Sequence, residues 1–219
     1  MTLESRQQKH NRSEEVTQAV QVLRRGGVVG YPSETVWGLA ALPTSRAAVE
    51  RLYTLKGREA SKPVQLSCLN MQRARGWLRP GQDELERLEI FWPGPLTVLA
   101  WATETCPAWL APGGVVGLRI PAHPVIQALL AAAGGTLATT SLNPSGLAAA
   151  SNQEQARAYG LADLLLSADD ASTAQWTSAA PVSSRSVSSG VASTVFDLRT
   201  RQVLRLGAVP HSELLAALV

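Results

Sequence analysis

Cysteine is scarce in this chain: its 219 residues include two, Cys68 and Cys106, and neither belongs to a CxxC motif. A disulfide framework needs several paired cysteines and a structural zinc site needs clustered Cys and His, so the sequence excludes the first and argues against the second. Apolar runs of membrane-spanning length are also missing, because Pro, Gly or charged residues interrupt every long one. The N-terminal segment MTLESRQQKHNR is polar. We therefore expect a cytoplasmic protein with reduced thiols and no membrane partner.

Established phosphate-binding motifs are absent as well. The segment Gly113–Pro121 is rich in glycine, but no Lys followed by Ser or Thr comes after its last glycine, and no GxGxxG occurs in the chain. These glycines are interpreted as turn formers. Arg119 lies between Leu118 and Ile120 in a predicted strand, so its guanidinium should face a partner or water. No carboxylate cluster marks a metal site, and we predict none.

Acidic residues are nearly missing from residues 51–80, where seven Lys or Arg stand against the single acid Glu59. The excess is local, because the formal charge of the whole chain is only +3. Such a patch suits a phosphate-bearing partner. A solvated basic face would have the same composition, and charge alone does not separate the two interpretations.

The residues that are present favour one α/β domain, since 45% of the chain is hydrophobic and its length allows a sizeable core. We divide the chain into a polar N-terminal tail (1–12), a domain (13–210) with a serine-rich mobile loop (183–190), and a C-terminal helix (211–219). Asn11 or Ser13 is predicted to cap the first helix and Gly26-Gly27 to end it. Further helices are predicted near 44–55, 83–90, 123–133 and 153–159, and strands near 28–31, 64–69, 96–101, 162–166, 193–198 and 203–206. Two more strands are predicted without fixed bounds, one within 113–121 that ends in an arginine and one at the start of the strand-to-loop segment 137–146.

The stretch Tyr31–Pro63 organises the candidate chemistry. The polar segment Ser33-Glu34-Thr35 follows a short strand and precedes a predicted helix. Three basic residues come at the exit of that helix: Lys56, Arg58 and Lys62. Ligands of open α/β sheets collect at strand ends, so both ends of this unit are expected to face one cleft. Ser141-Leu142-Asn143 presents further polar groups at another strand end, although the same residues would also suit an ordinary turn.

Seven segments with distinctive residues follow one another along the chain: Tyr31–Leu39, Lys56–Arg58 with Lys62-Pro63, Trp92–Thr97, Arg119–Pro124, Ser141–Gly146, Ser193–Val195 and Leu204–Gly207. Each segment is a weak signal alone. The ordered set resembles the Sua5/YrdC/TsaC family over residues 13–210. Because no long C-terminal extension follows, the resemblance is to the short bacterial single-domain form.

The resemblance implies a YrdC-like fold, a single-domain twisted mixed α/β sheet with flanking helices and a basic concave cavity. It also implies an enzyme, L-threonylcarbamoyladenylate synthase, a nucleotidyltransferase that joins L-threonine, bicarbonate or CO2 and ATP and releases pyrophosphate. Its product would serve the t6A37 modification of tRNAs reading ANN codons and pass to the threonylcarbamoyl-transferase complex, with direct tRNA contact left open. ATP would enter as a substrate with Mg²⁺, and no tightly bound cofactor is implied.

Site residues carry over from the family motifs to matching positions. The implied ATP-binding residues are Lys56, Arg58, Lys62, Val115, Ser141, Asn143 and Arg205, and Lys56 and Arg58 would also be catalytic. The implied threonine-binding residues are Thr35, Ser67, Arg119, Thr139 and Ser193. Lys and Arg suit this role because a carbamate and a triphosphate, both anionic, must be brought together.

Several positions depart from the family pattern. Ser33 stands where Thr is usual, Trp37 where Tyr is commoner, Ser67 where longer relatives often have His, and Ala148–Ala150 with Ser151 where Pro-Ser-Pro-Thr is usual. His123 could serve as a general base, but it precedes Pro124 at a strand-to-helix junction, so we interpret it as a helix-start residue.

Two alternative functions remain open. A non-catalytic RNA-binding module would use the same basic cavity and would bind RNA in a salt-sensitive way, indifferent to threonine. A carbamoyl-transfer domain like that of hydrogenase maturation proteins shares the implied fold, although the chain lacks an acylphosphatase-like or zinc-finger segment.

Overall fold

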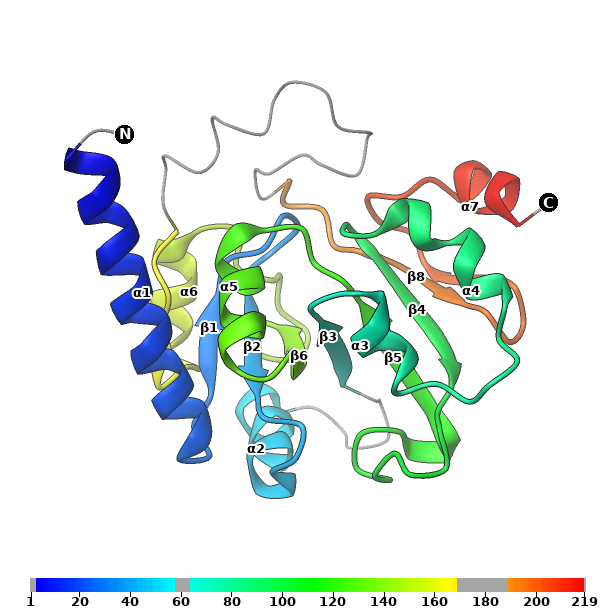
Figure 1. Cartoon of the computed structure of the whole chain (residues 1–219), viewed down its shortest axis with the longest axis horizontal. Coiled ribbons are helices and arrows are strands. Elements are labelled where there is room, and N and C mark those ends of the chain that lie inside the picture. The colour runs from blue at the N-terminus through cyan, green and yellow to red at the C-terminus, as the bar shows by residue number, and fades with distance from the viewer. Residues whose placement is uncertain (1–2, 58–63, 169–188, 219) are drawn as a thin grey trace.

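Short strands of small and aliphatic residues pair side by side in the computed structural model of the chain, which describes residues 3–57, 64–168 and 189–218. Within these residues one twisted mixed sheet has the strand order β7-β1-β2-β6-β3-β5-β4-β8-β9 (Figure 1). The pairs β1–β7, β3–β5 and β4–β8 are parallel, and the other neighbouring pairs are antiparallel. The strands are β1 (Val29–Tyr31), β2 (Gly38–Ala41), β3 (Gln65–Cys68), β4 (Leu96–Trp101), β5 (Val115–Arg119), β6 (Thr136–Ser141), β7 (Leu164–Leu165), β8 (Thr194–Asp197) and β9 (Gln202–Arg205). The sheet confirms the mixed α/β fold expected from the sequence.

Polar residues start several of the helices by capping free backbone amides. The Ser45 hydroxyl accepts a hydrogen bond from the Ala48 amide at 3.3 Å, and Asn70, His123 and Asn152 cap three further helices in the same way. The helices are α1 (Leu3–Arg24), α2 (Arg46–Lys56), α3 (Met71–Arg75), α4 (Glu84–Arg87), α5 (Pro124–Ala132), α6 (Gln153–Tyr159) and α7 (His211–Ala217), with short 3-10 turns η1 (Glu89–Phe91) and η2 (Pro112–Gly114). Among the described residues no helix is both long and apolar enough to cross a membrane.

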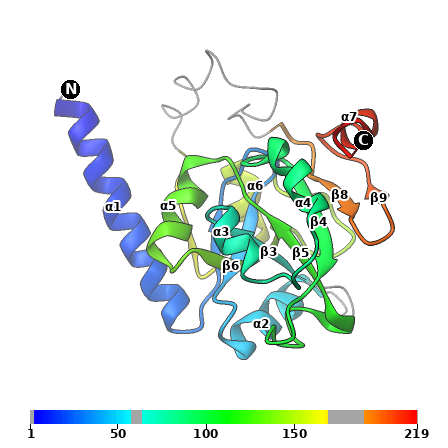
Figure 2. The same cartoon turned by 45° about the vertical axis from the view of Figure 1, so that its right-hand side comes forward.

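The two faces of the sheet bury separate apolar clusters, because successive strand residues point to opposite faces. On β2, Leu39 belongs to the larger cluster, which also contains Val49 and Leu52 of α2, whereas Ala40 belongs to the smaller one. The smaller cluster joins Leu137 of β6 to α1 and α5, which lie side by side against the sheet (Figures 1 and 2).

The face under α1 and α5 turns polar toward the middle of the sheet. Register places Thr139 of β6, Gln65 of β3 and Gly117 of β5 in one row across three neighbouring strands. Paired residues of neighbouring strands point the same way, so Ser67 and Arg119, which pair in the same register, share this face. Small and polar side chains thus replace apolar ones, and this part of the sheet forms the floor of the candidate site.

Three elements differ from the expectation. Helix α1 begins at Leu3, not at Asn11 or Ser13, because Glu, Gln, Arg and Lys form helix well even where no apolar stripe announces it. Strand β2 and helix α3 were not predicted at all. The sequence of β2, Gly-Leu-Ala-Ala, has no β-branched residue, and its backbone is a strand because it pairs with both β1 and β6.

Candidate active site

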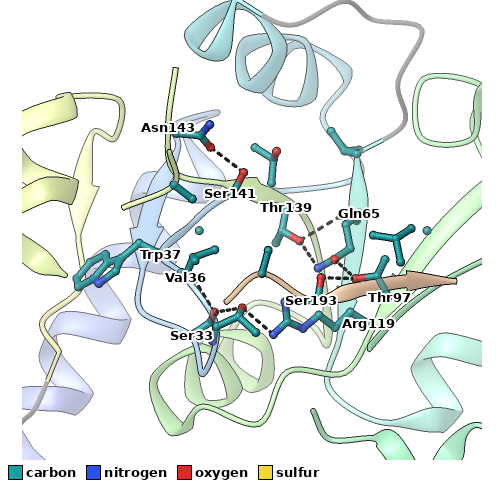
Figure 3. A pocket seen from close by; sticks show the side chains of 18 of the residues that line it. Ser33, Val36, Trp37, Gln65, Thr97, Arg119, Thr139, Ser141, Asn143 and Ser193 are labelled. Atoms are coloured by element: carbon teal, nitrogen blue, oxygen red, sulfur yellow. Dashed lines mark hydrogen bonds between the residues drawn. The ribbon is translucent and has the colours of Figure 1, made fainter. Parts of the chain in front are cut away.

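A cavity of about 510 Å³ opens over the polar part of the sheet (Figure 3). Gln65, Gly117 and Thr139 belong to its floor, and the loops after β1 and β6 and before β8 form its walls. Residues predicted for both substrates line it together: Thr35, Arg119, Thr139, Ser141, Asn143, Ser193 and Arg205. The fold therefore brings widely separated segments to one concave surface that contains two arginines.

Arg119 is buried at the cavity wall against a carboxylate that we did not assign from the sequence. Its Nη2 donates to Glu34 Oε1 at 2.7 Å and to Thr35 Oγ1 at 3.0 Å, and its Nε donates to the Gly94 carbonyl at 3.2 Å. Burial alone would raise the pKa of Glu34, but the charge of Arg119 and its hydrogen bond outweigh burial and hold this pKa below its ordinary value. Glu34 is therefore ionised, and the bonds that fix Arg119 leave its Nη1 to meet a ligand.

The backbone beside Arg119 is held by a distant part of the chain. The amides of Ser189 and Gly190 donate to the carbonyls of Glu34 and Thr35, each at 3.1 Å. These two residues end the predicted serine-rich loop, whose other positions, 183–188, lie outside the described residues. The contact ties the segment that leads into β8 to the loop after β1.

Lys56 lies beneath the cavity wall rather than in the cavity. Its Nζ donates to the Ser141 carbonyl at 2.6 Å, to Ser141 Oγ at 3.0 Å and to Asn143 Oδ1 at 2.8 Å. An ammonium carries three N–H groups, and the segment 141–143 supplies three acceptors, one for each of them. Lys56 is 6% exposed. It therefore holds this segment in place, and direct contact with a phosphate would require the exchange of one of these bonds.

Arg205 is anchored to the residue that precedes β8. Its Nη2 donates to the Ser193 carbonyl at 2.8 Å and to Ser193 Oγ at 3.0 Å, and its Nε donates to the same carbonyl at 3.1 Å. The Ser193 hydroxyl lies 2.9 Å from Thr97 Oγ1, which donates to Gln65 Oε1 at 2.7 Å (Figure 3). A line of hydrogen bonds thus crosses the floor from β9 to β3.

Two other predicted residues lie outside the cavity lining, and two more lie outside the described residues. Ser67 is fully buried and does not line the cavity. Its Oγ lies 2.8 Å from Thr139 Oγ1 and accepts a hydrogen bond from Gln65 Nε2 at 3.1 Å, and both of these residues line it. Val115 begins β5, at the end of the strand away from the arginine, and does not belong to the lining. Arg58 and Lys62 lie outside the described residues. Their assignments stay predictions.

Among the residues not assigned from the sequence, three take part in the hydrogen bonds of the cavity floor and wall: Glu34, Gln65 and Thr97. Glu34 lies inside the motif Tyr31–Leu39, where the hydroxyl groups of its neighbours suit substrate contacts better than its own carboxylate does. Gln65 is polar in a strand that we interpreted as buried, and that mismatch was the available signal. Only the sheet topology shows that it meets Thr97.

His123 is a helix-start residue, as predicted. Its Nδ1 accepts a hydrogen bond from the Val125 amide at 3.2 Å, which caps α5. The pKa of His123 is lowered to about 4, because the effect of burial is larger than the opposing effect of the Glu34 charge. The ring is therefore neutral at pH 7.

At positions where the sequence departs from the family pattern, the residues that are present make local hydrogen bonds. The Ser33 hydroxyl donates to the Val36 carbonyl at 2.6 Å, so the bond needs the oxygen and not the methyl group of Thr. Trp37 is buried, and its amide donates to the Ala150 carbonyl at 2.8 Å. The alanine run therefore still closes the turn beside the cavity.

A dedicated metal site does not emerge from the part of the chain that the structure describes, where no three His, Cys, Asp or Glu side chains are grouped to hold an ion. The buried carboxylate of Glu34 is already paired with Arg119. These residues do not fit a protein-bound Mg²⁺. We therefore assign no chemical step to a metal.

Sequence comparison relates the chain to named proteins. The model of the Sua5/YciO/YrdC family, described as "Telomere recombination", matches residues 21–207. The threonylcarbamoyl-AMP synthase of Halorhodospira halophila is 39% identical over 146 residues, which cover 66% of this chain and 76% of the relative. The threonylcarbamoyl-AMP synthase of Alkalilimnicola ehrlichii is 39% identical over 158 residues, which cover 68% of this chain and 82% of the relative.

Structure comparison agrees with the sequence match. The crystal structure of P. abyssi Sua5 complexed with L-threonine is similar with a TM-score of 0.79 and 27% identity. The match covers 92% of this chain and 56% of the solved chain, so this chain spans a little over half of that protein. The family match extends over most of the sequence and the fold match over nearly all of it, and both confirm the resemblance seen in the motifs. The chain belongs to the Sua5/YciO/YrdC family.

Proposed function

We propose that this chain is a threonylcarbamoyl-AMP synthase, which converts L-threonine, bicarbonate or CO2 and ATP into L-threonylcarbamoyladenylate and pyrophosphate. The observation that carries the proposal is the gathering of Arg119, Arg205 and the Lys56-held segment 141–143 around one cavity. The names of the curated relatives support the same activity. A nucleotidyltransferase of this kind must hold an amino acid and a nucleotide in contact, and one shared cavity meets that need.

The reaction joins two anions. The threonine amine adds to CO2 and loses a proton to give a carbamate, and a carbamate oxygen then attacks the α-phosphorus of ATP as the bond to pyrophosphate breaks. Cations that face both partners lower the repulsion between them, and fixed positions supply the entropic part of the rate enhancement. No protein nucleophile is required.

Arg119 is assigned to the carboxylate of threonine. Its guanidinium is fixed by Glu34, Thr35 and the Gly94 carbonyl, so Nη1 has a defined direction before a ligand arrives. Thr35 lines the same wall and would contact the amino acid next to it. A side chain held in this way loses little conformational freedom on binding, which favours affinity.

Ser141, Asn143 and Arg205 are assigned to the nucleotide. Lys56 orders the first two through its buried ammonium, and Arg205 supplies a positive charge at the edge of the cavity. Arg58 and Lys62 would add charge for the triphosphate. Mg²⁺ delivered with ATP, transfer of the product to a threonylcarbamoyl-transferase complex, tRNA contact and a cytoplasmic location are further parts of this proposal.

Pyrophosphate release tests the proposal. The enzyme should release pyrophosphate from ATP only when both threonine and bicarbonate are present, and Arg119→Met should raise the KM for threonine by at least about tenfold because a charged hydrogen bond is lost. Arg46→Met, on the exposed side of α2, is the matched control and should keep both values. Salt-sensitive RNA binding with no threonine-dependent release would favour the RNA-binding alternative. Release that required carbamoyl phosphate instead of bicarbonate would favour the carbamoyl-transfer alternative.

A further inference from the structure

Gln65 occupies the centre of the cavity floor, where hydrogen bonds from several strands converge. It lies on β3, and its partners in register are Thr139 on β6 and Gly117 on β5. Its side chain is half-buried and lines the cavity. Figure 3 shows its amide between Thr139 on one side and Thr97 on the other.

The missing side chain of Gly117 makes this arrangement possible. Strand β5 separates β3 from β4, so Gln65 and Thr97 can meet only by reaching across β5. A Cβ added at Gly117 would lie 3.1 Å from Leu99 Cδ2 and 3.8 Å from Thr97 Cγ2. A larger side chain would fill the space through which Gln65 Oε1 and Thr97 Oγ1 approach to 2.7 Å.

The hydrogen-bond chain through Gln65 has a defined direction. Thr97 donates the hydrogen bond of its one hydroxyl proton to Gln65 Oε1. It must therefore accept a hydrogen bond from the Ser193 hydroxyl, which itself accepts one from Arg205. At the other end, Gln65 Nε2 has two protons and two acceptors, Ser67 Oγ at 3.1 Å and Thr139 Oγ1 at 3.3 Å.

We propose that Gln65 is the positioning residue of the threonine subsite, because its one amide is bonded, directly or through Thr97, to three of the four hydroxyl groups assigned to that subsite. It holds Ser67 and Thr139 directly and Ser193 through Thr97. The inference rests on the proposed function and adds a residue to it. An aliphatic side chain at this position would remove the amide that links these hydroxyls. Ser67 and Thr139 would keep only their bond to each other and the bond of Thr139 to the Gln65 carbonyl, and Ser193 would keep its bond to Arg205. The polar floor under the amino acid would therefore be less well fixed.

Kinetics of Gln65→Leu test this role, since leucine keeps the volume and removes both ends of the amide. The KM for threonine should rise about tenfold, while the KM for ATP and kcat stay within about twofold of wild type. Gln202→Leu, at an exposed position of β9, is the matched control and should change none of these values. Thr97→Val removes the bonds of the Thr97 hydroxyl to Gln65 Oε1 and to Ser193 but keeps the bonds of Gln65 to Ser67 and Thr139, and it should raise the threonine KM by about threefold.

The possible outcomes separate the two proposals. Wild-type protein that shows no threonine-dependent pyrophosphate release would overturn the proposed function itself. An active wild type with a Gln65→Leu variant whose threonine KM is unchanged would overturn the positioning role alone. A variant that loses only kcat, in proportion to a lost folded fraction measured by thermal melting, would show a purely structural role and would also overturn it. If Gln65→Leu does not fold, the threonine KM of Thr97→Val decides by the same criterion.

Discussion

Buried charges at this site are matched by groups that satisfy them, and Lys56 is the plainest case. Its ammonium serves three acceptors of the segment 141–143. Lys56→Met would remove this donor from all three acceptors, although Asn143 Oδ1 would keep the bond from Ser141 Oγ. We expect the free energy of unfolding to fall by about 2–4 kcal/mol and pyrophosphate release by at least about tenfold. Arg46→Met removes an exposed ion pair and should change the unfolding free energy by less than about 1 kcal/mol. A Lys56→Met variant with the wild-type rate would contradict the assigned role.

Glu34 and Arg119 form the second buried pair. Glu34→Gln would leave the buried guanidinium without a counter-charge, and we expect a loss of about 3 kcal/mol of unfolding free energy. If the carboxylate of threonine binds Arg119, it would replace the lost charge. Threonine should then raise the melting temperature of Glu34→Gln more than that of the wild type. An equal or smaller increase in the variant would argue against the carboxylate role of Arg119, and the exposed Glu50→Gln serves as the control.

His123 gives the site a pH dependence that can be measured without substrate. Its pKa in the folded chain is about 4, below the ordinary value of 6.5. Between pH 6.5 and pH 4 the imidazole is therefore protonated in the unfolded chain and neutral in the folded chain. Stability should therefore fall as the pH drops from about 6.5 toward 4, by up to about 3 kcal/mol from this residue. His123→Asn keeps a capping side chain that does not titrate and should flatten this part of the curve in urea unfolding. His211→Asn, at an exposed position, should keep the wild-type curve. An unchanged slope in His123→Asn would show that other groups cause the dependence.

At the scale of single elements, the first position of β2 requires glycine because an aromatic ring packs against it. Gly38 pairs with Tyr31, and a Cβ at Gly38 would lie 2.4 Å from the Tyr31 ring. We expect Gly38→Ala to displace the ring and lower the unfolding free energy by about 1–3 kcal/mol. Gly76→Ala is the control, since its Cβ would meet nothing closer than 3.5 Å and its φ suits alanine. A Gly38→Ala variant as stable as Gly76→Ala would contradict the close packing.

The elements that the sequence predicts well are those with their own periodic signal. Helix α2 and strand β4 have apolar periods of the helical and buried-strand kind and match the expected ranges closely. Strand β2 and the first turns of α1 carry no such signal. β2 depends on pairing with strands distant in sequence, and the start of α1 depends on backbone propensity, so apolar patterns miss both.

At the scale of the whole molecule, the cavity exists because a mixed sheet brings five or more separated segments to one face. The motifs predicted that Arg119, Ser141 and Arg205 serve one site, and they line one cavity. The sequence did not predict the pairing of Arg119 with Glu34 or the bond of Gln65 to Thr97, because both depend on strand order. The contact between Gln65 and Thr97 crosses β5 and depends on the strand order and on the absence of a side chain at Gly117. A local sequence pattern shows neither of these.

The activity proposed for this cavity joins a carbon dioxide adduct of threonine to the α-phosphate of ATP. Mass spectrometry after incubation with threonine, ATP and isotopically labelled bicarbonate tests it most directly, because the product adenylate must carry the labelled carbon. We predict threonylcarbamoyl-AMP that contains the label, formed by the wild type and by Arg46→Met and strongly reduced in Arg119→Met. Folded protein that yields no labelled adenylate from the three substrates would contradict the account.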